Sequence, residues 1–198
     1  MDQTLRQRLI DMVEEARRMR SALAADGSLF IGYNAEMRAI NNAHARELAD
    51  IVDRHGWPDI AMVGQDGAAA AFILAQSAIG LPRFMRGCCE LIEAAVNEGR
   101  VPRWQLALLT DRIRWLEGRP QVYGTQFDWN AAGELVPLPI EDADNVDARR
   151  VLADLTSLAE GTKQRREEAD KNGERAPHDW AARQAEFENW AKAVGWRS

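Results

Sequence analysis

His55 is the residue of this sequence best suited to proton transfer, because an imidazole exchanges protons near neutral pH. It ends an amphipathic stretch and precedes the turn-forming sequence Gly56-Trp57-Pro58, where the mouth of a pocket can form. A structural role fits its position equally well, since a histidine at a helix C-terminus can cap the last carbonyls. The other two histidines, His44 in mid-helix and His178 in a polar segment, are assigned no role.

Asp111 and Arg112 interrupt the apolar face of a predicted helix over residues 102–117. Two charges in such a place need a partner or a cavity, because isolated buried charges are costly. In a functional interpretation, Asp111 orients His55 or receives its proton, while Arg112 holds a carboxylate or phosphate oxygen. In a structural interpretation, Asp111 and Arg112 form an ion pair that clamps the neighbouring hairpin.

Polar side chains also gather in the segment that begins at Gln121. As a strand, this segment places Gln121, Tyr123 and Thr125 on one face and Gln126 on the other. Gly124 lets a ligand approach the backbone closely. We therefore expect a neutral hydrogen-bonding wall, in which Tyr123 joins His55 and Asp111 in catalysis while Gln121 and Gln126 bind the ligand.

Gln76 and Ser77 interrupt the most apolar predicted helix. A buried amide must be hydrogen-bonded, so Gln76 contacts either a ligand or a neighbouring backbone group. We include Gln76 with Arg112, Gln121 and Gln126 among the candidate ligand-binding residues.

The sequence lacks the motifs of familiar cofactor and covalent chemistries. It contains no P-loop, no GxGxxG and no GxSxG, and its cysteines lack metal-ligand spacing to a histidine, so we predict no cofactor and no metal. Cys88 and Cys89 lie in a core-like helical stripe, where burial keeps thiols inert. Adjacent cysteines rarely meet disulfide geometry, so a reducing compartment fits better than an oxidising one.

The spacing of apolar residues predicts the helices that must position these groups. Apolar residues recur every three or four positions in six segments, which are residues 4–25, 34–54, 67–79, 82–99, 102–117 and 146–155. Between the last two, residues 121–129 and 134–138 alternate apolar and polar side chains around the turn-forming residues 130–133. This pattern predicts a β-hairpin over about residues 121–138.

The C-terminal part of the sequence has a different character. Residues 157–175 are charged and nearly devoid of large apolar side chains, which indicates either a solvated helix or a tether. The last twenty residues regain an aromatic stripe with Trp180, Phe187 and Trp190, so we expect an amphipathic helix that docks on the body or on another subunit.

Together these elements predict a mainly α fold. We expect a single helical domain of about six helices over residues 1–155, with the small β-hairpin at one end. A charged tether and the C-terminal amphipathic helix form the second segment, residues 156–198.

Composition and charge exclude several classes of function. The chain of 198 residues carries 25 basic and 31 acidic side chains, a net charge of −6, which opposes tight binding to nucleic acid. It has neither a secretory signal nor an apolar run long enough to cross a bilayer, so we expect a cytoplasmic protein without a membrane partner.

Several short motifs, taken in order, resemble a bacterial family catalogued as domain of unknown function 6624. These are HGWP at 55–58, VG at 63–64, LTDRI at 109–113, QVYGTQ at 121–126, PLPIED at 137–142 and VDARR at 146–150. The resemblance covers about residues 30–155 and implies a site at the residues already chosen, but no reaction. It also implies that many members carry a histidine where this chain has Ser77.

Two functions from different classes remain open. In the first, a pocket between the helix over 102–117 and the hairpin binds a small ligand, with Arg112 holding an anionic group and His55 and Asp111 handling protons. In the second, the polar residues form a structural network, and the protein is a non-catalytic interaction protein. Its partner, a second copy or another protein, is then met through Trp180, Phe187 and Trp190.

Overall fold

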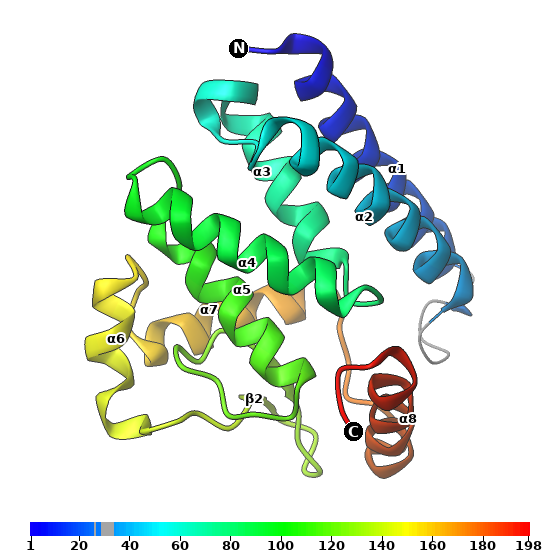
Figure 1. Ribbon diagram of the computed structural model, residues 1–198. Coiled ribbons are helices and arrows are strands. Elements are labelled where there is room, and N and C mark those ends of the chain that lie inside the picture. The colour runs from blue at the N-terminus through cyan, green and yellow to red at the C-terminus, as the bar shows by residue number, and fades with distance from the viewer. Residues whose placement is uncertain (26, 29–33) are drawn as a thin grey trace. The chain divides into compact units, whose positions relative to one another are not determined.

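The chain is mainly α, as predicted. The computed structural model describes residues 1–25, 27–28 and 34–198, which form eight α-helices, a short 3-10 helix and a two-stranded antiparallel sheet (Figure 1). The elements are α1 (Gln3–Ala25), α2 (Ala35–His55), α3 (Ile60–Ser77), α4 (Pro82–Asn97), α5 (Arg103–Leu116), β1 (Phe127–Trp129), β2 (Leu135–Pro137), η2 (Ala143–Asn145), α6 (Val146–Leu152), α7 (Leu158–Lys171) and α8 (Trp180–Val194). Among the described helices, none has the combination of length and apolar character that crossing a membrane requires.

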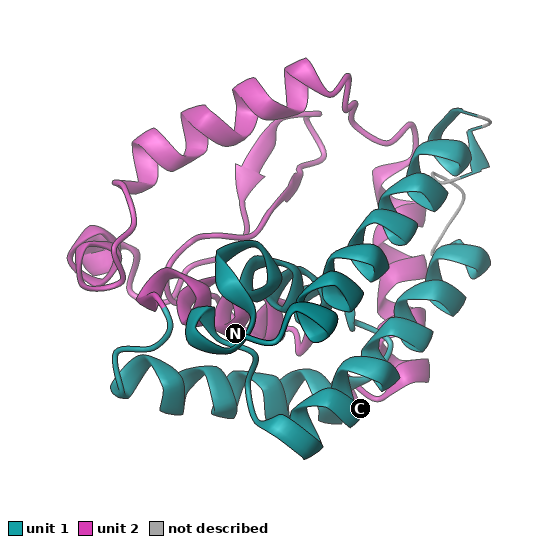
Figure 2. Ribbon diagram, turned by 90° about the horizontal axis from the view of Figure 1, so that it is seen from above, with its two compact units in different colours: residues 1–101 teal, residues 102–198 magenta. Residues whose placement is uncertain are grey.

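The chain divides into two compact units, residues 1–101 and residues 102–198 (Figure 2). The division predicted from sequence, after residue 155, falls between α6 and α7, which contact each other within the second unit. Domain organisation in the sense of independent folding therefore stays a prediction.

The first unit is built on three mutually contacting helices, α1, α2 and α3, with α4 against α3. Its fully buried side chains come from all four helices, and they include Leu9, Met12, Leu48, Val63, Met85 and Ile92. Charged pairs tie the helices at their rims, with Arg8 donating to Glu47 on α2 and Arg6 donating to Asp66 on α3. The amphipathic patterns of the sequence are thus satisfied within the unit.

Helix α3 begins seven residues earlier than the sequence predicts, but a break interrupts it. Gly64 lies inside the helix with φ 74° and ψ 172°, a conformation that only glycine adopts without strain. Asp66 follows the break and accepts a hydrogen bond from the N–H of Gly67. The helical segment from Gly67 onward is therefore the apolar helix that the sequence indicates.

The second unit contains α5, the hairpin and the three C-terminal helices. Leu109, Ile113 and Leu116 form the buried face of α5, and Leu135 and Val146 add buried side chains from β2 and α6. Strand β1 pairs antiparallel with β2, with Asp128 opposite Val136. A short hairpin has few buried residues of its own, so it depends on the helices of this unit.

The predicted strand over residues 121–129 is wrong in its first two thirds. Only Phe127–Trp129 forms a strand, whereas residues 121–126 form a loop with one isolated bridge between Gln121 and Ile140. Gln121, Tyr123 and Thr125 therefore do not share the face of a strand. The physical reason is that the backbone N–H groups of Val122, Tyr123 and Thr125 donate to a side chain of α5 rather than to a partner strand.

The two C-terminal segments also become defined. Residues 158–171, for which a helix and a tether were both open, form α7, and Arg166 on this helix donates to the carbonyl of Leu135 at 2.8 Å. The predicted terminal amphipathic helix is α8. With α7 counted, the described residues contain more α-helices than the sequence predicts.

Candidate functional site

Asp111 on α5 is the organising residue of the 121–126 loop. It is 0% exposed, and its carboxylate accepts hydrogen bonds from the backbone N–H groups of Val122 at 2.7 Å, Tyr123 at 3.0 Å and Thr125 at 2.9 Å. The Thr125 hydroxyl donates to the same carboxylate at 3.0 Å. Donors of this kind stabilise a buried carboxylate, so Asp111 fixes the loop through its backbone.

Gln121 closes the base of the same loop. Its side chain is 1% exposed, and its amide donates to the carbonyls of Gln126 at 2.9 Å and Leu138 at 2.8 Å. Its carbonyl oxygen accepts from the N–H of Gln126 at 2.8 Å. All of these partners are backbone groups, which favours a structural role for Gln121 over ligand binding.

Two arginines of α6 bind the carbonyl groups of the loop. Arg149 donates to Val122 at 2.8 Å, and Arg150 donates to Tyr123 at 2.6 Å and to Thr156 at 2.6 Å. Arg150 is 4% exposed, and burial lowers the pKa of its guanidinium below the ordinary value. The sequence analysis did not choose either arginine as a site residue, although both lie in the VDARR motif.

Gly124 gives the loop its shape. Its φ of +69° is in the left-handed region, and a Cβ atom at this position would lie 2.8 Å from side-chain atoms of both Ile140 and Leu158. The space that the sequence analysis reserved for a ligand beside Gly124 is thus filled by side chains of the same unit.

Arg112, Tyr123 and Gln126 are the half-buried members of the predicted set in the second unit. Arg112 donates to the side-chain oxygen of Gln126 at 3.3 Å, and the amide of Gln126 donates to the hydroxyl of Thr125 at 3.2 Å. Ligand binding by Arg112 and Gln126 and catalysis by Tyr123 stay predictions.

His55 and Gln76 belong to the first compact unit, whereas the other five predicted residues belong to the second. His55 is exposed at the last position of α2, where the N–H of Gly56 already donates to the carbonyl of Val52 at 2.9 Å. Gln76 is half-buried near the end of α3. The predicted contact between His55 and Asp111 stays a prediction.

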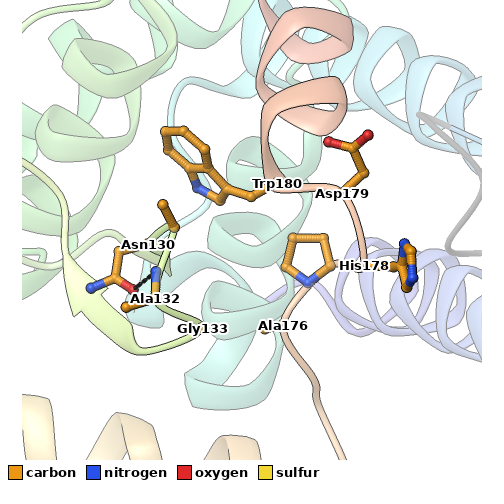
Figure 3. A pocket seen from close by; sticks show the side chains of 9 residues that line it. Asn130, Ala132, Gly133, Ala176, His178, Asp179 and Trp180 are labelled. Carbon is orange, nitrogen blue, oxygen red and sulfur yellow. Dashed lines mark hydrogen bonds between the residues drawn. The ribbon is translucent and has the colours of Figure 1, made fainter.

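A pocket of about 430 Å³ lies between the hairpin turn and the segment that leads into α8 (Figure 3). It is lined by Asn130, Ala131, Ala132, Gly133, Ala176, Pro177, His178, Asp179 and Trp180. This pocket is not predictable from the sequence, because small turn residues supply most of its wall. The available signal was His178 close to Trp180, two side chains that can contact a ligand from a polar segment.

Local hydrogen bonds hold both walls of the pocket. The side-chain oxygen of Asn130 accepts from the N–H of Ala132 at 3.0 Å and fixes the turn. Asp179 caps α8 by accepting from the N–H of Ala182 at 2.8 Å. The indole N–H of Trp180 donates to the carbonyl of Trp129 at 2.7 Å, which connects the two walls.

The pocket lining favours neutral or cationic ligands over anions. The nine lining residues include the carboxylate of Asp179 and the imidazole of His178, but neither arginine nor lysine. Trp180 is 37% exposed and offers an aromatic surface beside these polar groups. Most small-molecule sites have this composition, an apolar or aromatic surface with a few polar groups that orient the ligand.

Residues 3–170 match a family that is described as a family of unknown function, DUF6624. The chain belongs to this family. The DUF6624 match includes Asp111, the 121–126 loop and both arginines of α6, but it ends before α8 and Trp180. No curated protein and no solved structure matches the chain.

The described part of this DUF6624 member contains no group of three or more His, Cys, Asp or Glu side chains placed to hold a metal ion. Neither cysteine forms a disulfide, and burial raises the pKa of the Cys88 thiol to about 12. At neutral pH such a thiol stays protonated, so Cys88 is unsuited to nucleophilic chemistry.

Proposed function

We propose that this protein binds a small, neutral, hydroxyl-rich ligand of the saccharide type in the pocket between the hairpin turn and α8. The observation that carries the proposal is the partly exposed indole of Trp180, which is held in place by its bond to Trp129 and lines a pocket of about 430 Å³. The C–H face of a sugar ring packs on an indole, while hydroxyl groups bond to polar neighbours. The polar backbone groups of the residues that line the pocket supply such neighbours.

A different site, around Arg112, is less well supported by the geometry. There, an anionic ligand would be held by Arg112, with His55 and Asp111 transferring protons. The carboxylate of Asp111 is 0% exposed and its oxygens accept from four donors of the loop, so a proton transfer would require the loop to open. Binding without chemistry at Asp111 therefore fits better.

A reducing compartment, such as the bacterial cytoplasm, is part of the same proposal. Its support is that neither Cys88 nor Cys89 forms a disulfide.

The test is a titration of the full chain with mono- and disaccharides. Binding is monitored through the chemical shifts of the amide and indole N–H groups in NMR spectra. We expect shifts at Ala131, Gly133 and the indole N–H of Trp180. The variant Trp180→Ala removes the aromatic surface and should weaken binding about tenfold or more, equivalent to roughly 1.4 kcal/mol. The control variant Trp180→Phe keeps an aromatic ring and should weaken binding less than Trp180→Ala does.

Two results would contradict the proposal. One is a saccharide panel that leaves the signals of the pocket unmoved. The other is binding that Trp180→Ala does not weaken, which would place the ligand elsewhere. A matched titration with inorganic phosphate checks the charge argument, because Asp179 and the absence of a cation in the lining predict no phosphate binding at this pocket.

A further inference from the structure

Helix α8 and the residues just beyond it lie outside the region that matches DUF6624, yet their side chains contact three parts of that region. These are Asp128 and Trp129 of the hairpin, the ring of Trp115, and the last carbonyls of α5. We propose that these groups form a helix-docking surface on the family core, and that α8 is an intramolecular ligand of this surface that can be exchanged for a partner helix of the same pattern.

Aromatic stacking supplies the central contact. The rings of Trp115 and Phe187 are stacked, with centroids 4.8 Å apart and planes within 6°. Trp190 lies beside Phe187 at 5.6 Å, and the guanidinium of Arg197 lies 5.2 Å from the Phe187 ring. Offset stacking and cation–π contacts of this kind add to the burial of the rings.

Asp128 supplies the charge that selects the docked helix. It is only 8% exposed in β1, and its carboxylate accepts from Arg183 at 2.6 Å and from Gln184 at 3.2 Å. A nearly buried carboxylate needs a cationic or hydrogen-bonding partner. Because Arg183 and Gln184 are both on α8, loss of this helix leaves Asp128 without these two donors.

The end of α5 is the third part of the surface. Arg197, just beyond α8, donates to the carbonyl of Leu116 at 2.9 Å and to that of Trp115 at 2.8 Å. The last carbonyls of a helix have no partner within it, so they accept readily from a side chain of another segment. Glu188 pairs with Arg197 and thereby links α8 to this contact.

The attachment of α8 is suited to exchange. On the helix itself only Ala191 is buried, so α8 contributes little to an apolar core. Segments with few buried apolar contacts open at a lower free energy than the core does. The aromatic residues Trp180, Phe187 and Trp190, for which the sequence left docking on the body or on another subunit open, contact their own chain.

The pattern of α8 defines the partner chemically. Arg183, Phe187 and Trp190 occupy positions i, i+4 and i+7, which lie on one face of a helix. A partner that replaces α8 is therefore an amphipathic helix with an arginine one turn before an aromatic pair. Recognition of this kind, a helix laid on a surface through anchors at i, i+4 and i+7, is common among protein complexes.

The test uses the full chain with a protease site inserted after Gly173, an exposed position with open space around its Cα. The protein is folded, cut, and mixed with a fluorescent synthetic peptide of residues 176–198, and binding is followed by fluorescence anisotropy. We expect the peptide to exchange with the cut segment. The uncut chain should bind the peptide at least about tenfold more weakly, because its tethered α8 has a high effective concentration.

Charge reversal makes the test specific. The peptide with Arg183→Glu should bind the cut protein at least about tenfold more weakly, a change of about 1.4 kcal/mol. Asp128→Arg in the protein should restore binding of that peptide. Lys192→Glu is the matched control. The side chain of Lys192 is half exposed, and its ammonium lies 3.9 Å from Glu188 on the same helix. Within the described part of the chain, Lys192 forms no ion pair with the hairpin. Lys192→Glu should change affinity by less than Arg183→Glu does.

Three outcomes overturn the proposal. If the cut protein loses helical circular dichroism beyond the contribution of α8, or if the cut segment never exchanges, then α8 is a fixed part of the fold. If the charge-swapped pair does not bind, Asp128 does not select the helix.

Hydrogen exchange of the intact chain is an independent measurement. We expect the amides of α8 to exchange faster than those of α5, and equal protection of the two helices would contradict the proposal.

Discussion

At the scale of single residues, Asp111 shows how one carboxylate can replace a strand. An ionised carboxylate has about four acceptor positions, and the loop and the Thr125 hydroxyl provide four donors. Successive N–H groups around a left-handed glycine commonly bind an anion, and here the anion is supplied by α5. The same interruption of an apolar stripe that suggested a site in the sequence is thus explained by local structure.

This arrangement predicts a large effect of Asp111→Ala. The substitution leaves three backbone N–H groups and one hydroxyl without their acceptor in a buried place, so we expect a loss of about 3 kcal/mol or more in the free energy of unfolding. Urea denaturation measures it. The control is Asp144→Ala on the exposed η2 segment, which should change stability by less than about 0.5 kcal/mol. A similar small loss for both variants would contradict the organising role of Asp111.

At the scale of elements, the 121–126 loop is where sequence patterns and structure disagree most. Alternating polar and apolar residues indicate a strand, but the pattern does not predict which groups pair with the backbone N–H and C=O groups of the segment. Here Asp111 accepts from N–H groups of the loop, and Arg149 and Arg150 donate to its carbonyl groups. These partners lie 11 and 27 residues away in sequence, on α5 and α6. The loop could therefore not be predicted from its own residues.

Two glycine variants test the shape of this loop. Gly124→Ala combines a φ of +69° with a Cβ that meets Ile140 and Leu158 at 2.8 Å, so it should lower the free energy of unfolding by about 1–3 kcal/mol. Gly87→Ala is the matched control, because Gly87 lies inside α4 with nothing within 4 Å of the added Cβ. This change should raise stability by up to about 1 kcal/mol. Thermal and urea unfolding of both variants would show opposite signs, and equal signs would contradict the loop geometry.

The helices were more predictable than the loop. Apolar residues that recur every three or four positions indicate both the helix and the face of it that is buried. The sequence indicated α1, α2, α4, α5 and α8 with boundaries within a few residues. It left α7 open, since a helix with one buried residue, Ala169, has almost no apolar stripe to detect.

The pocket beside Trp180 could not be predicted for a related reason. Its walls are turn residues brought together by the fold, and only His178 and Trp180 have side chains that signal a site.

At the scale of the whole molecule, the excess of acidic residues is partly held in ion pairs that respond to pH. The Arg8 guanidinium donates to Glu47 and holds the pKa of that carboxyl below its ordinary value of 4.5, and Arg6 acts in the same way on Asp66. These carboxyls bind protons less tightly in the folded state than in the unfolded state. Their contribution to stability is therefore complete above the unfolded pKa and is lost as the pH falls through the lowered folded pKa.

This linkage predicts that the free energy of unfolding decreases as the pH is lowered from about 4.5. Glu47→Gln removes one of the groups responsible, and its effect should be about 0.5 kcal/mol at pH 7, because the pair is partly exposed and screened. The difference between Glu47→Gln and the unaltered chain should become smaller as the pH falls below about 4.5. Urea denaturation at pH 7, 4.5 and 3 measures this, with Glu14→Gln on exposed α1 as the control. A difference that grows on acidification would contradict the sign.

The contact between Arg197 and the end of α5 has a consequence for the order of folding. The donor and its acceptor at Leu116 are separated by 81 residues, so this bond at the end of α5 requires a segment that is synthesised long after the helix itself. Contacts of such long sequence separation form late, because the entropy of closing the intervening loop opposes them. We expect the last turn of α5 to form in a nascent chain that ends before α8, through the N–H groups of Glu117 and Gly118, and the bonds from Arg197 to be added only when that residue has been synthesised.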